Sequence, residues 1–167
     1  MLLDTDVNAN LIRYLRAVRF SVLFATKVKV NIRDDAAIVK WARRHNRILV
    51  CHDKYQNREH KIKVFQEIYA HGGHVIQIAG GSGQDILTSL GKLLANREEW
   101  VNFFKQNDGV ALVHRGGMKP MPRQYLIRQI QGTLGGKTGI GDIPLRSPRR
   151  QRQPKIKPTS PNKPPLL

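Results

Sequence analysis

The chain has 167 residues, 40% of them apolar, which is enough to bury one ordinary hydrophobic core. Its net charge of +17, from 29 lysines and arginines against 12 aspartates and glutamates, favours phosphate-rich partners, although a merely basic or ribosome-associated protein would share it. The single cysteine, Cys51, excludes an internal disulfide, and without a secretory signal or a membrane-spanning apolar run we expect a cytoplasmic protein with no membrane partner.

The first part of the chain alternates strand-like and helix-like segments. Residues 1–3 read as a short strand that delivers Asp4 and Asp6 to its exit. Apolar side chains at helical spacing follow over residues 11–18. Residues 20–26, FSVLFAT, have the β-branched and aromatic content of a second strand.

A helix, a tight connection and a buried strand then lead to a carboxylate. The helix over residues 35–45 has one apolar face, and Asp34 and Asp35 suit its positive N-terminal end. Residues 47–51, RILVC, are too short and too apolar to be anything but an interior strand. Asp53 therefore lies just past the carboxyl end of a strand, the edge at which open α/β sheets build their sites.

The same alternation continues through the middle of the chain. We expect a helix over residues 59–71, stopped by Gly72 and Gly73, and then a strand over residues 75–79. A long helix follows, capped by Ser82 with Asp85 three residues on, and broken near Asn96. The last expected elements are a strand over residues 110–114 and a short edge strand over residues 125–127. The long helix should bury Ile86, Leu87, Leu90, Leu93 and Leu94. Regular alternation predicts an α/β fold with a mainly parallel sheet and right-handed crossovers.

The composition changes from about residue 132. Residues 137–167 contain seven of the nine prolines and carry eight cations against one acid, a net of +7 out of +17 that leaves +10 on residues 1–136. Such a segment cannot bury enough apolar surface to order itself. We therefore expect one folded domain over residues 1–131 and a disordered basic tail over residues 132–167.

Acids are scarce in this chain, and three of them lie at element ends. If the first and third strands are parallel neighbours, Asp4 and Asp53 leave the sheet at one edge, from which the helix beginning at Asp35 also starts. Converging carboxylates raise one another's pKa unless a cation compensates them. Hard oxygen ligands suit Mg²⁺ or Mn²⁺, which can activate a water and neutralise charge on a phosphate. The alternative is that Asp35 only caps its helix and Asp53 only starts a turn.

Three segments together resemble the PIN-like family, in particular its compact bacterial branch: LLDTD at residues 2–6, DDAAIVKWARRHN at 34–46 and ILVCHDKY at 48–55. The resemblance covers roughly residues 1–114. It implies a three-layer α/β/α fold and a metal-dependent nuclease site, with RNA cleavage the usual activity of PIN toxins.

Carried over by position, the resemblance implies that Asp4, Asp35 and Asp53 are the catalytic and metal-binding acids, with Asp6 as a further ligand where relatives commonly have Asn. Tyr55 stands where many relatives place a second carboxylate, and the middle Glu of full-length PIN nucleases has no evident counterpart. Two interpretations stay open: one metal completed by waters and Asp6, or a non-catalytic module that binds RNA or a partner protein.

The basic residues predict how a nucleic acid would be held. We expect Lys54 beside the site, and Arg149, Arg150 and Arg152 in the tail, to bind RNA through its phosphates by counterion release, without base readout. The toxin interpretation also implies an acidic, antitoxin-like partner, and a homodimer is left open.

Two further features are expected at the same edge. The glycine-rich loop over residues 80–83 could cradle a phosphate in a nucleotide-dependent enzyme, but Ile86 replaces the third glycine of the dinucleotide fingerprint, and ordinary loop chemistry is preferred. His52, beside Asp53, could contact a substrate phosphate or donate a proton, although a histidine that follows a strand more often does neither.

Overall fold

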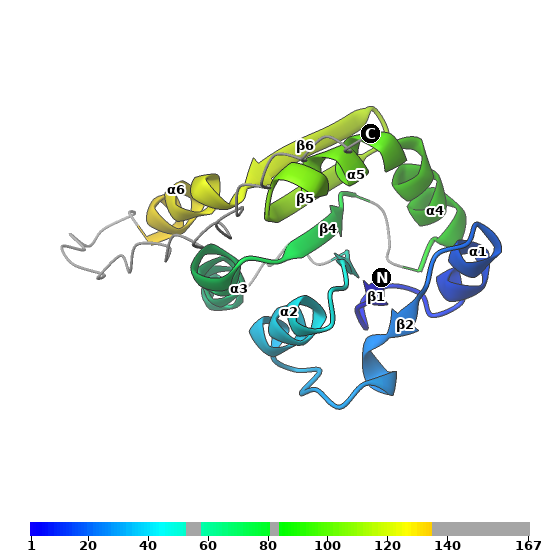
Figure 1. The fold of residues 1–167 in the computed structure, drawn as a ribbon, viewed down its shortest axis with the longest axis horizontal. Helices are drawn as coiled ribbons and strands as arrows, with labels where there is room; N and C mark the ends of the chain where they lie inside the picture. The colour runs from blue at the N-terminus through cyan, green and yellow to red at the C-terminus, as the bar shows by residue number, and fades with distance from the viewer. Residues whose placement is uncertain (53–57, 81–83, 135–167) are drawn as a thin grey trace, which may run out of the picture.

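A single six-stranded sheet organises the protein (Figure 1), and the computed structural model describes it over residues 1–52, 58–80 and 84–134. The strands are β1 (Leu2–Leu3), β2 (Leu23–Phe24), β3 (Leu49–Cys51), β4 (His74–Ile78), β5 (Gly109–His114) and β6 (Gly117–Pro122). The helices are α1 (Leu11–Ala17), α2 (Asp35–Arg44), α3 (Arg58–His71), α4 (Ile86–Ala95), α5 (Arg97–Gln106) and α6 (Arg123–Leu134), and a 3₁₀ turn, η1, covers Ala25–Lys27.

The sheet order is β2-β1-β3-β4-β5-β6, and every pair is parallel except β5 with β6. β1 pairs with β3 in a register that places Leu3 opposite Val50. The prediction that the first and third strands are parallel neighbours is therefore confirmed. All five parallel strands point their carboxyl ends toward one edge of the sheet.

Helices cover both faces of the sheet, which confirms the predicted three-layer α/β/α architecture. One face packs Leu2, Leu49, Cys51, Val75 and Val110 against apolar side chains of α2, α3 and α6. The other face packs Leu3, Val50, Ile76, Ile78, Ala111 and Val113 against α1, α4 and α5. The alternation of the two sets along each strand follows from the two-residue period of a strand.

The crossover connections do not all have the same hand. The β3–β4 and β4–β5 connections step in the same direction across the sheet, yet α3 lies on one face while α4 and α5 lie on the other. These two crossovers therefore have opposite hands, so the prediction of right-handed crossovers is wrong for one of them. From β3 the chain continues to α3 on one face of the sheet. From both neighbours of β3, which are β1 and β4, it continues to α1 and α4 on the other face. In open α/β sheets, ligands commonly bind at such a switch point, at the carboxyl ends of the strands.

Several boundaries agree with the sequence analysis. α3 ends at His71, and Gly72 follows with a φ of 80°, a conformation that favours glycine. The break predicted near Asn96 is present, because Asn96 separates α4 from α5 and its side-chain amide donates to the carbonyl oxygens of Lys92 (2.7 Å) and His114 (3.1 Å).

Other local predictions are wrong. The second strand is shorter than expected and passes directly into η1. The N-cap of α4 is Asp85, whose Oδ1 accepts from the Thr88 amide at 3.0 Å, and not Ser82, which lies outside the described residues. Residues 125–127 are helical within α6, and the edge of the sheet is instead β6.

The predicted division into domain and tail falls within α6, which continues from Arg123 to Leu134 past the expected boundary at residue 131. Residues 135–167 lie outside the described part of the chain. None of the helices that the structure describes combines the length and the apolar character needed to cross a bilayer.

Candidate functional site

The exits of β1 and β3 are joined by two hydrogen bonds. The Asp4 amide donates to the carbonyl oxygen of Val50 at 2.9 Å. Two residues further along each chain segment, the His52 amide donates to Oδ2 of Asp6 at 2.8 Å. The order of strands in the sheet thus brings Asp4, Asp6 and His52 together at its carboxyl edge.

Asp4 is the most enclosed acid at this edge. Only 6% of the residue is exposed, and its Oδ1 accepts from the Thr5 amide at 2.6 Å. A buried carboxylate costs free energy unless hydrogen bonds or a positive charge compensate it. Asp4 also begins a turn, because its carbonyl oxygen accepts from the Val7 amide at 3.2 Å, so this turn holds a buried acid at the edge of the sheet.

His52 is held by a hydroxyl from the opposite side of the site. Ser89 of α4 donates its hydroxyl proton to the carbonyl oxygen of Asp85 at 2.7 Å, so its oxygen accepts from Nε2 of His52 at 2.8 Å. Burial, and next the positive charge of Lys92, lower the pKa of His52, while Asp85 opposes them. The neutral ring with its proton on Nε2 satisfies both observations.

Lys92 extends the site along the edge to β4. Its ammonium nitrogen Nζ donates to the carbonyl oxygens of Ala79 and Gly80, each at 2.7 Å. These carbonyls directly follow β4. Lys92 therefore fixes a positive charge at the carboxyl edge, where it can balance carboxylates or attract a phosphate.

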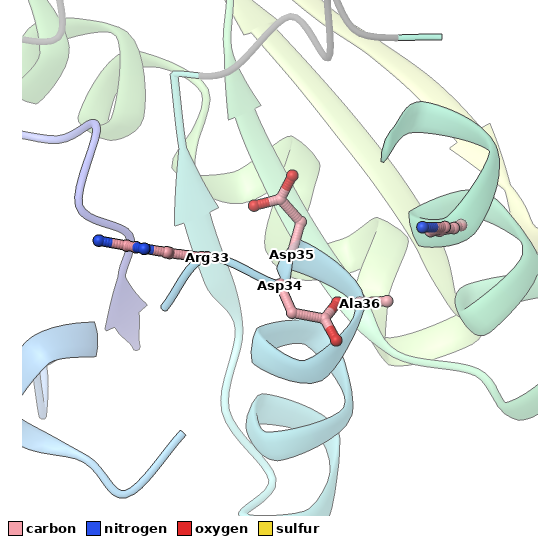
Figure 2. A pocket seen from close by; sticks show the side chains of 5 residues that line it. Arg33, Asp34, Asp35 and Ala36 are labelled. Atoms are coloured by element: carbon pink, nitrogen blue, oxygen red, sulfur yellow. The ribbon is translucent and has the colours of Figure 1, made fainter. Parts of the chain in front are cut away.

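Asp34 and Asp35 have different roles at the start of α2. Oδ1 of Asp34 accepts from the Ala37 amide at 3.2 Å, so Asp34 is the N-cap and the alternative that Asp35 is the cap is wrong. Asp35 is half-buried in the first turn and lines a small pocket with Arg33, Asp34, Ala36 and Lys63. In Figure 2 the two carboxylates point in different directions, and the N-terminal end of α2 faces the same way as the arrowhead of β3.

Removing the N-cap side chain of α2 is expected to lower the stability of the protein. Replacing Asp34 by Ala should lower the free energy of unfolding by about 1 kcal/mol, because the Ala37 amide loses its acceptor. Replacing it by Asn should cost much less, since Asn is an equally good N-cap. Urea denaturation of the two variants checks this, and equal losses would show that the charge of Asp34 matters and the cap does not.

Several predicted site residues lie in segments that the structure does not describe. Asp53 and Lys54 lie outside the described residues, as do Tyr55 and the tail residues Arg149, Arg150 and Arg152. Within residues 1–52, 58–80 and 84–134, no group of three or more histidines, cysteines, aspartates or glutamates is placed to hold a metal ion. A three-carboxylate site would therefore need Asp53, which directly follows His52 in the chain.

The acids that are described fit Mg²⁺ or Mn²⁺ by ligand type. Asp4 and Asp6 supply carboxylate oxygens from the exit of one strand, and Asp35 supplies another from the start of α2. Hard oxygen donors that leave room for waters are the ligands these cations prefer. The observation that supports this fit is the position of Asp4, a buried acid that directly follows β1 at the carboxyl edge of the sheet.

Ser89 and Lys92 are the functional candidates that sequence reasoning missed. A signal was present, since Ser89 falls at helical spacing between Ile86 and Leu93 on the apolar face of α4. A buried hydroxyl on an apolar face needs hydrogen-bond partners, which here are the carbonyl oxygen of Asp85 and Nε2 of His52.

Comparison with family models, with curated proteins and with solved structures gave no match. The fold and the site thus define an α/β/α protein with an acidic and histidine-containing site at the carboxyl edge of its sheet.

Proposed function

We propose that this protein is a divalent-metal-dependent nuclease of the PIN-like kind that hydrolyses phosphodiester bonds in RNA. The observation that supports it most directly is the junction of the β1 and β3 exits, where the Asp6 carboxylate accepts from the His52 amide at 2.8 Å. Asp4 lies at this junction, and Asp53 directly follows His52 in the chain.

In this proposal Asp53 would hold the cation together with ligands drawn from Asp4, Asp6 and Asp35, because these three described acids do not form a metal site by themselves. When bound, Mg²⁺ or Mn²⁺ supplies a water of lowered pKa and neutralises charge on the phosphate. Asp6 also ties the β3 exit to the β1 exit through the His52 amide. Ser89 fixes the ring of His52 beside this junction, where it can contact the substrate.

The positive residues hold the RNA strand. Lys92 places an ammonium group at the edge, and Lys54 follows Asp53 in the chain. The basic tail with Arg149, Arg150 and Arg152 adds non-specific affinity by counterion release. The net charge of +17 supports this role and would equally attract an acidic, antitoxin-like protein.

Metal removal provides the direct test. We expect a labelled single-stranded RNA to be cleaved by the purified protein in Mn²⁺ and to remain intact in EDTA. Gel analysis of the products measures both arms. RNA that binds at low salt but stays intact in every condition would contradict the nuclease and favour the non-catalytic binding module.

The melting temperature gives a readout independent of substrate choice. A cation that binds the folded chain at about 100 times its Kd should add about 2.7 kcal/mol of stability by mass action. Differential scanning fluorimetry across a Mn²⁺ series measures the shift. A melting temperature that does not change at any concentration would argue against a metal site at these acids.

A further inference from the structure

A groove lies beside the candidate site, on the outer side of α4. It has a volume of about 350 Å³ and is lined by Leu87, Thr88, Gly91, Lys92, Ala95 and Arg115. Five of these residues belong to α4, and Arg115 follows the carboxyl end of β5. Figure 1 shows α4 next to the turn that joins β5 to β6.

The groove opens at the same edge of the sheet as the acids. Lys92 donates to the carbonyl oxygens of Ala79 and Gly80 at the exit of β4, and the Asn96 amide donates to the carbonyl oxygen of His114 at the exit of β5. In the sheet, β5 is two strands from β3. Two strand spacings are about 10 Å, so the groove and the candidate site can be spanned by one short strand of RNA.

The floor of the groove is apolar. Leu87 is 74% exposed, an unusual position for a leucine that the helical pattern predicts to be buried. An added Cβ at Gly91 would meet no atom within 4 Å, so the helix surface there is open. An open apolar surface of this kind can contact the face of a base.

The walls of the groove are positive. Two of the three N–H donors of Lys92 are used by carbonyls, which leaves one for an anion in the part of the chain that the structure describes. Arg115 is exposed on the turn after β5. An apolar floor between two cations complements a nucleotide, whose base is flat and whose phosphate is negative, better than it complements an apolar protein surface.

We propose that this groove binds one nucleotide of single-stranded RNA, with the base on Leu87 and Gly91 and the phosphate between Lys92 and Arg115. The choice of RNA rests on the proposed nuclease function. Through its shape and charge, the groove would position the RNA strand, which continues from the groove to Asp4 and His52.

Gly91 allows a test that leaves the core untouched. The variant Gly91→Gln should fill the groove, whereas Ala17→Gln adds a glutamine side chain at an exposed position of α1 that does not line the groove. We expect Gly91→Gln to weaken binding of a labelled ten-nucleotide RNA at least about fivefold, because stacking of one base contributes about 1–3 kcal/mol. Ala17→Gln should bind within about twofold of the unchanged protein.

Fluorescence anisotropy in EDTA measures this binding without cleavage, so the result does not depend on whether the nuclease proposal holds. Thermal melts of both variants confirm that they are folded. RNA binding by Gly91→Gln equal to that of Ala17→Gln would overturn the proposal. So would a loss of self-association in Gly91→Gln with unchanged RNA binding, which would make the groove a protein contact.

A second pair of variants separates the groove from general charge. Arg115→Ala and Arg13→Ala remove the same charge, but Arg13 is exposed on α1 and does not line the groove. We expect Arg115→Ala to weaken RNA binding at least about threefold more than Arg13→Ala does, because Arg115 faces the bound phosphate and Arg13 does not. Equal losses of RNA affinity in the two variants would show that Arg115 contributes only non-specific charge, and would also overturn the proposal.

Discussion

Replacing Asp4 by Asn is expected to lower the rate of RNA cleavage by about 100-fold or more while the protein stays folded. The amide keeps the oxygen that accepts from Thr5, so the local hydrogen bond survives. What is lost is the negative charge of an acid that is only 6% exposed at the exit of β1. Initial rates on a labelled single-stranded RNA in Mn²⁺ measure the change.

Asp108→Asn is the matched control for this variant. Asp108 also accepts from a backbone amide, that of Gly73 at 3.0 Å, but it precedes β5 and therefore lies at the opposite edge of the sheet. Its cleavage rate should stay within about twofold of the unchanged protein. Asp53→Asn should behave like Asp4→Asn, and full activity in either of these two variants would remove the metal-site proposal.

Leu93→Ala is expected to lower the free energy of unfolding by about 2–5 kcal/mol. Leu93 is 1% exposed and packs with Leu3, Ile76 and Trp100 in the core on the α4 face of the sheet. Removing its side chain leaves a cavity in a region that is held in place by several elements. Because the total free energy of unfolding of a small domain is only about 5–15 kcal/mol, the melting temperature should fall by many degrees.

The same substitution at Leu87 provides the comparison. Leu87 lies on the same helix and is 74% exposed, so Leu87→Ala should change stability by no more than about 0.5 kcal/mol. Both variants alter the intrinsic helix propensity equally, which leaves burial as the difference. Urea denaturation measures both, and similar losses would mean that α4 does not pack on the sheet through Leu93.

The local pattern was sufficient to place most elements of the sheet. The run RILVC predicted β3 because a short apolar segment after an amphipathic helix has few alternatives, and glycines at residues 72 and 73 predicted the end of α3. β6 and α6 were not predicted. Prolines 120 and 122 argue against a strand, but an edge strand that pairs on only one side tolerates them.

The burial of individual residues on α4 also required the tertiary structure. Helical spacing places Leu87 next to Ile86 and Leu90, and all three were predicted to be buried. Only the orientation of α4 against the sheet decides that Leu93 faces the core while Leu87 faces the groove. Similarly, Asp85 and not Ser82 begins the helix, because its side chain is the one that reaches the Thr88 amide.

Apolar periodicity and strand length are local properties, so they were enough to predict the class of fold and the positions of acids at strand ends. The tertiary structure alone decided that Asp6 meets His52, which is 46 residues away, and that Ser89 meets His52 across 37 residues. It also placed Lys92 at the exit of β4 and Arg115 beside α4. These contacts depend on which strands pair and on which face each helix covers, and both are set by long-range packing that no local pattern encodes.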